Sequence, residues 1–166
     1  MKNENVVKLG VLFFMVSIFG YFYELILCLI YNDKLISHGI LYGPWLPIYG
    51  TGAILISMLN KYRKSPFIIF FSSFFLAGTL EYLCGIVLLK IFKMRLWDYT
   101  GMFLNIDGLV CLLSAFCFGI GGLIIIYLLI PLINKLLKKI NFKKIKIILL
   151  LLSGLFLGDI ILSSLN

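Results

Sequence analysis

The sequence predicts an all-α integral membrane protein, built as a bundle of about five transmembrane helices. Of its 166 residues, 62% are hydrophobic and only 13% are charged, whereas soluble domains are typically about 45–50% apolar and about 25% charged. The mean hydropathy is +1.10. A chain of this length cannot bury so many apolar side chains in a core of its own. The composition therefore excludes a soluble enzyme, a nucleic-acid-binding protein and a disordered chain.

Five apolar runs predict the spans, since a helix that crosses a bilayer uses about 20 residues. The first run follows a short polar start, is longer than a signal-peptide core and has no small-residue cleavage motif, so we expect a retained helix. The runs make one polytopic transmembrane domain over residues 1–166, with no room for an attached ATPase domain. The expected spans are residues 6–31, 42–60, 66–92, 108–133 and 145–165.

The second expected span is the shortest and begins in a segment rich in glycine and proline. Pro44 and Pro47 cannot donate backbone hydrogen bonds, so irregular backbone here must be buried in protein or line a wet cavity. Either tilt and the preceding residues complete a span, or the segment is a re-entrant outer loop. The residues expected to shape this loop are Gly39, Gly43, Pro44, Pro47 and Gly50.

The distribution of lysine and arginine predicts the orientation. Eleven of these cations fall on the side of the amino terminus and four on the other side, if all five runs cross the membrane. By the positive-inside rule the amino terminus is cytoplasmic and the carboxyl terminus is outside. The expected location is the inner, or plasma, membrane. An even number of spans would break this assignment.

The connection between the fourth and fifth spans is rich in lysine. Its apolar and lysine positions alternate at near-helical spacing, so it can lie on the inner leaflet and contact anionic lipid headgroups. It can also dock a cytoplasmic partner, and the candidate docking residues are Lys138, Lys139, Lys143 and Lys144.

Motifs for metal, redox or nucleophilic chemistry are missing from the sequence. The four cysteines lie within apolar runs and have no C-x-x-C spacing, which is typical of small buried side chains. The single histidine, His38, has no serine or cysteine motif around it. We expect no catalytic residue, no metal site and no cofactor.

Ionisable groups inside the spans are the main functional candidates, because each costs at least about 2.5 kcal/mol at the centre of a membrane helix. Three carboxylates qualify: Glu24, Glu81 and Asp159. Glu24 lies on a polar-leaning helix face, and small residues flank Glu81 at four-residue spacing. Asp159 is the weaker candidate, because near the carboxyl end it can simply reach the outer surface.

Both glutamates are expected in the outward half or near the middle of the membrane, which suggests an outward-facing acidic pocket. In the alternative, each glutamate is protonated or paired and only ties helices together. Tyr49 and Tyr99 would supply aromatic walls, and Asp98 and Asn105 would orient the loop that carries them over the pocket mouth. The candidate substrate- or ion-binding residues are Glu24, His38, Tyr49, Glu81, Asp98, Tyr99 and Asn105.

Three motifs are long and ordered: G-x-L-x-G-P-x-x-P-I-Y-G from Gly39 to Gly50, L-E-Y around Glu81, and W-D-Y-T from Trp97 to Thr100. With the stretches 20–24 and 105–112, they resemble the ABC-transporter type IV permease family, also called CmpB-like membrane proteins. The resemblance implies a permease subunit that depends on a separate cytoplasmic ATPase. Family members usually have arginine where this chain has His38, so a charge pairing there would depend on pH.

Two functional hypotheses follow, with a structural scaffold as a third. The first is a permease-like subunit, without ATPase activity of its own, that binds or passes a small substrate through the acidic pocket. The second is an outer-leaflet enzyme or lipid-binding protein that uses the same carboxylates for acid and base chemistry. Expected partners are membrane lipids, a cytoplasmic ATPase subunit and a second copy of the chain, and nucleic acid is not expected.

Overall fold

The computed structural model describes residues 2–30 and 40–165. In this part of the chain all regular structure is helical except for one isolated bridge between Ile106 and Val110, which confirms the all-α prediction. The elements are α1 (Lys2–Ile30), α2 (Pro47–Ser57), η1 (Met58–Tyr62), α3 (Pro66–Val87), η2 (Leu88–Phe92), α4 (Leu112–Ile124), η3 (Ile125–Leu129), α5 (Ile130–Lys139) and α6 (Phe142–Ser164).

Four stretches within the described residues are long and apolar enough to cross a membrane: Glu4–Leu27, Pro66–Phe92, Leu112–Lys139 and Phe142–Ser164. The second expected span contains only the 11-residue α2 and the short η1. Pro47 stands in the first turn of α2, where its missing N–H and fixed φ are tolerated. This helix is too short to reach across a bilayer by itself.

The third long stretch ends later than the sequence suggests, at Lys139 rather than near residue 133. Proline in a helix interior lacks an N–H and clashes with the carbonyl four residues earlier. The π-helical turn η3 comes directly before the turn that contains Pro131, and such turns adjust the helical hydrogen-bonding pattern locally. The helix therefore continues through the proline into the lysine-rich region.

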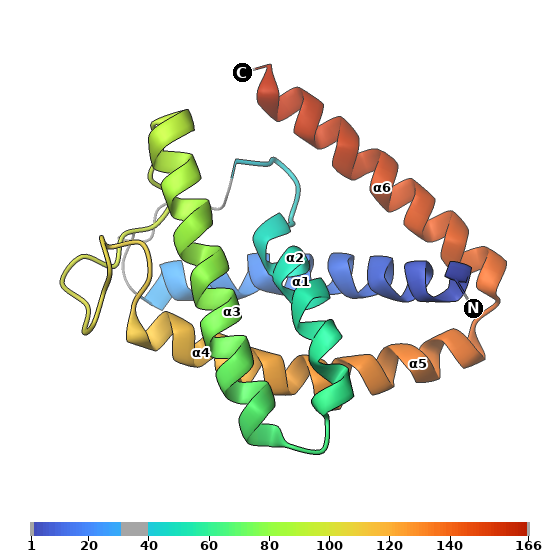
Figure 1. Ribbon diagram of the computed structural model, residues 1–166. Coiled ribbons are helices and arrows are strands. Elements are labelled where there is room, and N and C mark those ends of the chain that lie inside the picture. Colours follow the sequence, from blue (N-terminus) through green and yellow to red (C-terminus); the bar gives the residue numbers. More distant parts are fainter. Residues whose placement is uncertain (1, 31–39, 166) are drawn as a thin grey trace.

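In Figure 1, α1 and the continuous α4–η3–α5 run in opposite directions, and the α2–α3 hairpin lies across them. Helices α3 and α4 pack together most extensively, followed by α1 and α2. The common core contains fully buried aliphatic side chains from α1, α3 and the long helix, among them Leu12, Ile69, Ile126 and Ile133. Gly50 lets α2 approach α1 closely, because a Cβ there would collide with Ser17 and Phe13.

Helix α6 turns back at Ile140–Asn141 and diverges from the other helices toward its carboxyl end (Figure 1). The Asn141 side chain caps it by accepting a 2.9 Å bond from the Lys143 amide. Of its residues only Ile145 and Asp159 are buried. Gly154 and Gly158 have no other atom within 4 Å of their would-be Cβ positions, so part of α6 is left without protein packing.

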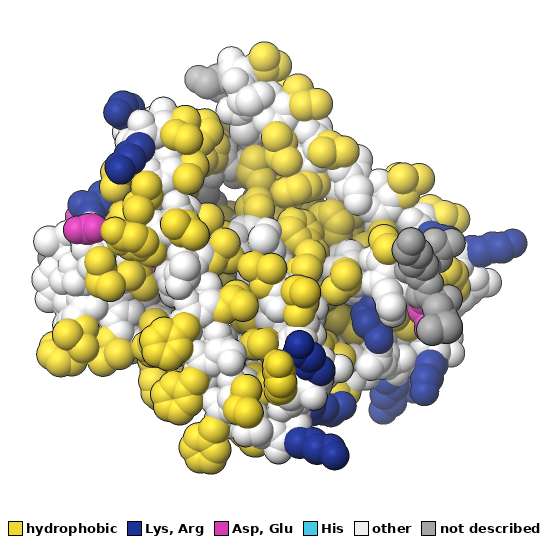
Figure 2. All heavy atoms as spheres, in the orientation of Figure 1, with side chains coloured by type: hydrophobic (Ala, Val, Ile, Leu, Met, Phe, Trp, Pro, Cys, Tyr) yellow, Lys and Arg dark blue, Asp and Glu magenta, His cyan; other side chains and the backbone are white. Residues whose placement is uncertain are grey.

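Figure 2 shows where the charged side chains gather on one face of the molecule. Lysine and arginine cluster over the α2–α3 connection and the α5–α6 turn, and a smaller group lies at the opposite end near the loop that follows η2. Apolar side chains cover much of the surface between the two groups. This pattern is typical of a membrane protein with one more basic side.

Candidate functional site

The Glu24 carboxylate is held by a tyrosine from another helix. The Tyr49 hydroxyl on α2 donates a 3.0 Å hydrogen bond to Glu24 Oε1 on α1. Gly20, one turn before Glu24, makes room for the Tyr49 ring, since a Cβ there would collide with it. The ring also makes edge contacts with Tyr23 and Phe118, at centroid distances of 6.4 and 6.3 Å. The sequence-predicted Glu24 and Tyr49 are therefore brought together.

Two hydroxyl groups hold the second glutamate. Tyr99 donates a 2.9 Å hydrogen bond to Glu81 Oε1, and Ser114 Oγ donates a 2.9 Å bond to Glu81 Oε2. The side chain of Glu81 is only 6% exposed. Each oxygen of this carboxylate thus has one hydroxyl donor, from the loop before α4 and from the first turn of α4.

The two glutamate–tyrosine pairs lie within electrostatic reach of each other. Burial is the main cause that raises the pKa of Tyr99 well above its usual range. The negative charge of Glu81 and the hydrogen bond to it raise this pKa further, and so does the charge of Glu24. A carboxylate on α1 therefore acts on a tyrosine that binds a carboxylate on α3, and the four residues form one polar cluster among apolar helices.

The loop of residues 93–111 positions Tyr99 through an internal hydrogen-bond network. The Tyr99 amide donates to the Gly108 carbonyl at 2.9 Å. Arg95 Nη2 donates to the Asp107 carbonyl at 2.7 Å, and Trp97 Nε1 donates to the Leu109 carbonyl at 2.8 Å. These bonds join the first and second halves of the loop. The backbone that carries the Tyr99 side chain is therefore held in place by hydrogen bonds.

Gly108 allows the two halves of the loop to meet. Its φ is +67°, a left-handed conformation that favours glycine. A Cβ at this position would lie 2.7 Å from atoms of Arg95 and Asp98. The close approach of the two halves therefore depends on the absence of a side chain at residue 108.

Asp98 and Asn105 act within this loop and have no hydrogen bond to either glutamate. Asp98 pairs with Arg95 at 3.0 Å and accepts a 2.8 Å bond from the Thr100 amide. The bonds to Thr100 are the main cause that lowers the pKa of Asp98. The Asn105 amide donates to the Met102 carbonyl at 2.8 Å and its oxygen accepts from the Gly108 amide at 3.2 Å. Both residues thus shape the loop that carries Tyr99.

Asp159 is where the sequence interpretation is wrong. It does not reach the outer surface, because its side chain is only 8% exposed. Its carboxylate accepts bonds from the amides of Tyr42 and Gly43 at 3.0 and 2.9 Å, and from Trp45 Nε1 at 2.7 Å. A weaker 3.4 Å bond comes from Ser163. Apart from Ser163, the partners lie more than a hundred residues earlier in the chain, so local sequence could not reveal them.

The other loop residues surround this contact. Gly43 lies against the Trp45 ring, where a Cβ would collide with the indole. Pro44 is exposed, and Pro47 begins α2. Two predicted site residues, His38 and Gly39, lie outside the described residues.

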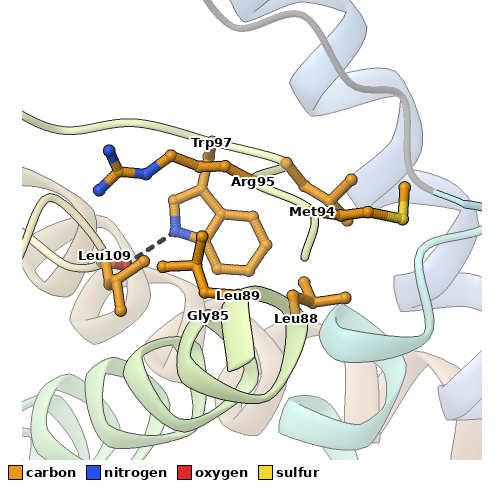
Figure 3. Close-up of a pocket in the computed structure, with 8 residues that line it drawn as sticks. Gly85, Leu88, Leu89, Met94, Arg95, Trp97 and Leu109 are labelled. Carbon is orange, nitrogen blue, oxygen red and sulfur yellow. Dashed lines mark hydrogen bonds between the residues drawn. The ribbon is translucent and has the colours of Figure 1, made fainter. Parts of the chain in front are cut away.

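Figure 3 shows a small pocket under the Trp97 ring, next to the loop of residues 93–111. Its lining is apolar apart from Arg95, and neither glutamate belongs to it. The pocket residues are Gly85, Leu88, Leu89, Met94, Arg95, Leu96, Trp97 and Leu109. The polar cluster and the pocket are therefore separate features.

The four candidate docking lysines gather at the α5–α6 turn. Lys138 and Lys139 lie in the last turn of α5, and Lys143 and Lys144 lie in the first turn of α6. All four are exposed. In the described ranges 2–30 and 40–165, no group of three or more histidine, cysteine or acidic residues could hold a metal ion.

Sequence reasoning missed two further polar residues, Ser114 and Tyr82. Ser114 forms a capping box with Cys111, which is recognisable as a serine at the third position of an apolar helix. No local sequence pattern indicates the second hydrogen bond of Ser114, which goes to Glu81. Tyr82 donates a 2.8 Å bond to Asp107 and so anchors the loop to α3. These residues link the predicted site to its supporting loop.

The chain matches a known protein family over residues 11–164, described as Putative ABC-transporter type IV. Neither the curated proteins nor the solved structures contain a match to the chain. With its four long apolar helices, the chain is thus a multi-pass membrane protein related to ABC transporters. The match confirms the resemblance carried by the sequence motifs: the chain belongs to the ABC-transporter type IV family.

Proposed function

We propose that the protein is a permease-like subunit of an ABC-type transporter in the plasma membrane, and that its Glu24–Glu81 cluster binds a cation. The cation is a proton or the positively charged group of a small substrate. The observation that carries the proposal is that two carboxylates within apolar helices, Glu24 on α1 and Glu81 on α3, are each held by a tyrosine hydroxyl.

Charge is the reason that this pairing favours a cation. Two ionised carboxylates in a poorly hydrated region repel each other, and a proton or cation between them relieves the repulsion. Among the described residues, Arg95 and Asp98 form an ion pair, whereas neither glutamate takes part in an ion pair. An ionised carboxylate can accept about four hydrogen bonds, so Glu24 and Glu81 keep acceptor capacity for a ligand beyond their hydroxyl partners.

The neighbouring side chains suggest a role for each group. Glu24 and Glu81 would supply the negative charge, and the hydroxyls of Tyr49 and Tyr99 would orient the two carboxylates. The Tyr23 and Phe118 rings beside Tyr49 would offer faces to an ammonium group, since cations are attracted to aromatic rings. The loop of residues 93–111 would cover the cluster.

Carbodiimide labelling tests the proposal without a known substrate. Dicyclohexylcarbodiimide modifies protonated carboxyl groups in apolar surroundings, and mass spectrometry quantifies the adduct at Glu24 and at Glu81. We expect sodium, potassium or an organic amine to protect both residues, and Glu24→Gln to abolish the protection at Glu81. Equal labelling of Glu81 at every cation concentration and at every pH would contradict a cation site.

The ATPase partner is a second part of the proposal, based on the exposed lysines of the α5–α6 turn. Purification of the tagged protein in mild detergent should recover a stoichiometric ATPase subunit. Replacing Lys138, Lys139, Lys143 and Lys144 with glutamine should release it. The matched control is Lys90→Gln with Lys93→Gln, near the other end of the molecule, which should leave the complex intact. If no ATPase is recovered with the folded protein, this part of the proposal fails.

A further inference from the structure

Helix α6 contacts the rest of the protein mainly along one face. Leu149 lies 3.3 Å from the would-be Cβ position of Gly10 on α1. The Phe156 ring makes edge contacts with Phe13 and with Trp45, at centroid distances of 5.7 and 5.9 Å. Asp159 is the next residue on this face, three positions after Phe156. Its hydrogen bonds to Tyr42, Gly43 and Trp45 tie the last part of α6, which ends at Ser164, to the segment before α2.

The segment bound by Asp159 leads directly into α2. Trp45, whose indole binds Asp159, is followed by Leu46, and both are buried. The Leu46 amide donates to the Ser17 carbonyl of α1 at 3.1 Å, and the Leu46 carbonyl accepts from the Tyr49 amide at 3.1 Å. The start of α2 at Pro47 is thus fixed between α1 and α6, only two residues before Tyr49, the tyrosine that binds Glu24.

No side-chain bond caps the start of α2. Leu46 occupies the N-cap position and cannot accept a hydrogen bond through its side chain. The position of this helix end therefore depends on tertiary contacts, of which the Asp159 bonds are the shortest polar ones. The Glu81 half of the site differs, because its partners come from the loop of residues 93–111 and from α4.

We propose that Asp159 is a positioning residue for Tyr49, so that α6 controls the Glu24 half of the polar cluster and leaves the Glu81 half unaffected. The inference depends on the proposed function in one respect only, namely the identity of the ligand that the Glu24–Tyr49 pair binds. Because α6 begins among the exposed lysines next to α5, a partner bound there could act on the site through the same helix.

The test compares carbodiimide labelling of Glu24 and Glu81 in the full chain, without any added cation substrate. The Tyr49 hydroxyl donates a hydrogen bond to the Glu24 carboxylate, which favours its ionised form. Asp159→Asn replaces one carboxylate oxygen with an NH2 group, which cannot accept from the N–H donors on its side of the carboxylate. The weakened contact should release this tyrosine. We expect labelling of Glu24 to rise by about threefold or more relative to Glu81, as loss of a hydrogen bond to a charged group implies.

Three variants make the result specific. Tyr49→Phe should raise Glu24 labelling in the same way, and the double variant with Asp159→Asn should add little to it. Gly158→Ala is the matched control, since its Cβ would meet nothing within 4 Å, and it should leave the ratio unchanged. If Asp159→Asn does not fold, Trp45→Phe removes only one donor and should move the ratio in the same direction.

Two outcomes would overturn the inference. Equal increases at Glu24 and Glu81 would mean that Asp159 supports the fold in general. An unchanged ratio in the folded Asp159→Asn variant would mean that Tyr49 is held without it. Neither outcome depends on cation protection, so failure of the cation site in the labelling experiment described above leaves this comparison intact.

Discussion

The carboxylates of the membrane helices have two kinds of hydrogen-bond donor. Asp159 is bound mainly by two backbone amides and an indole N–H, with one longer bond from Ser163. Glu24 and Glu81 are bound by hydroxyls of tyrosine and serine. Backbone amides are fixed by the fold and can only donate. A hydroxyl can rotate, accept a bond and pass a proton. The difference separates an acid that joins distant segments of the fold from two acids that are held by rotatable hydroxyls.

The largest expected effect comes from removing the amide-bound acid. Asp159→Ala leaves the buried Trp45 N–H and two partly buried backbone amides without this acceptor. A buried donor left without an acceptor costs about 1–3 kcal/mol. We expect the free energy of unfolding to fall by about 3 kcal/mol or more, measured by denaturant unfolding in detergent. Glu24→Gln, which keeps an acceptor for Tyr49, should change it by less than about 1 kcal/mol. Similar losses of unfolding free energy in both variants would mean that the amide-bound and hydroxyl-bound acids do not differ in their structural role.

A smaller effect is expected from crowding the hydroxyl-bound acid. Gly20→Ala would push the Tyr49 ring away from Glu24, and such overpacking costs about 1–3 kcal/mol. Cation protection at Glu24 should weaken in the same variant. Gly154→Ala on α6 has no neighbour within 4 Å and serves as the control in both measurements. A neutral Gly20→Ala variant with unchanged protection would show that the ring can move without affecting the site.

The two hydroxyls on Glu81 should contribute unequally to stability. Ser114→Ala removes a donor to Glu81 and also breaks the capping box at the start of α4, so we expect a loss of about 2 kcal/mol. Tyr99→Phe removes a hydrogen bond only and should cost about 1 kcal/mol. Thermal unfolding of both variants measures the difference. An equal loss would mean that the cap adds nothing.

The smallest effect concerns the solvent-exposed acid of the loop. The pKa of Asp98 is lowered in the folded protein, mainly by its bonds to Thr100. Its contribution to stability is therefore present above the unfolded pKa, about 3.9, and is lost as the pH falls through the lower folded pKa. Wild type should unfold at a higher temperature than Asp98→Asn at pH 6, and the gap should close toward pH 3. A difference in unfolding temperature that stays constant across this pH range would contradict the lowered pKa of Asp98.

The apolar pattern predicted the helices well where tertiary contacts do not decide their ends. The expected span of residues 66–92 coincides with α3 and η2, because Pro66 marks its start and the run is continuous. The fourth helix runs past Pro131 to Lys139, since a π-helical turn before the proline is not encoded in hydropathy. The short α2 is set by packing of glycines against α1, which a hydropathy window does not register.

The candidate site was predictable in part for a physical reason. Charged residues in apolar runs stand out, so Glu24 and Glu81 became the main candidates. Tyr49 and Tyr99 were expected only as aromatic walls of a pocket, not as hydrogen-bond donors to these glutamates. The structure pairs Tyr49 with Glu24 and Tyr99 with Glu81. Ser114 and the role of Asp159 were not predictable, because both depend on contacts between segments more than thirty residues apart in the chain.

The left-handed turn at Gly108 also limits how this sequence can vary. Residue 108 combines a positive φ with a Cβ position already filled by Thr100, Arg95 and Asp98, so every other amino acid meets both a backbone penalty and a collision. Gly101 has a φ of +88° but open space around it, and asparagine tolerates such a conformation better than most residues do. In a library of variants, position 108 should therefore accept glycine alone, while position 101 should also admit asparagine.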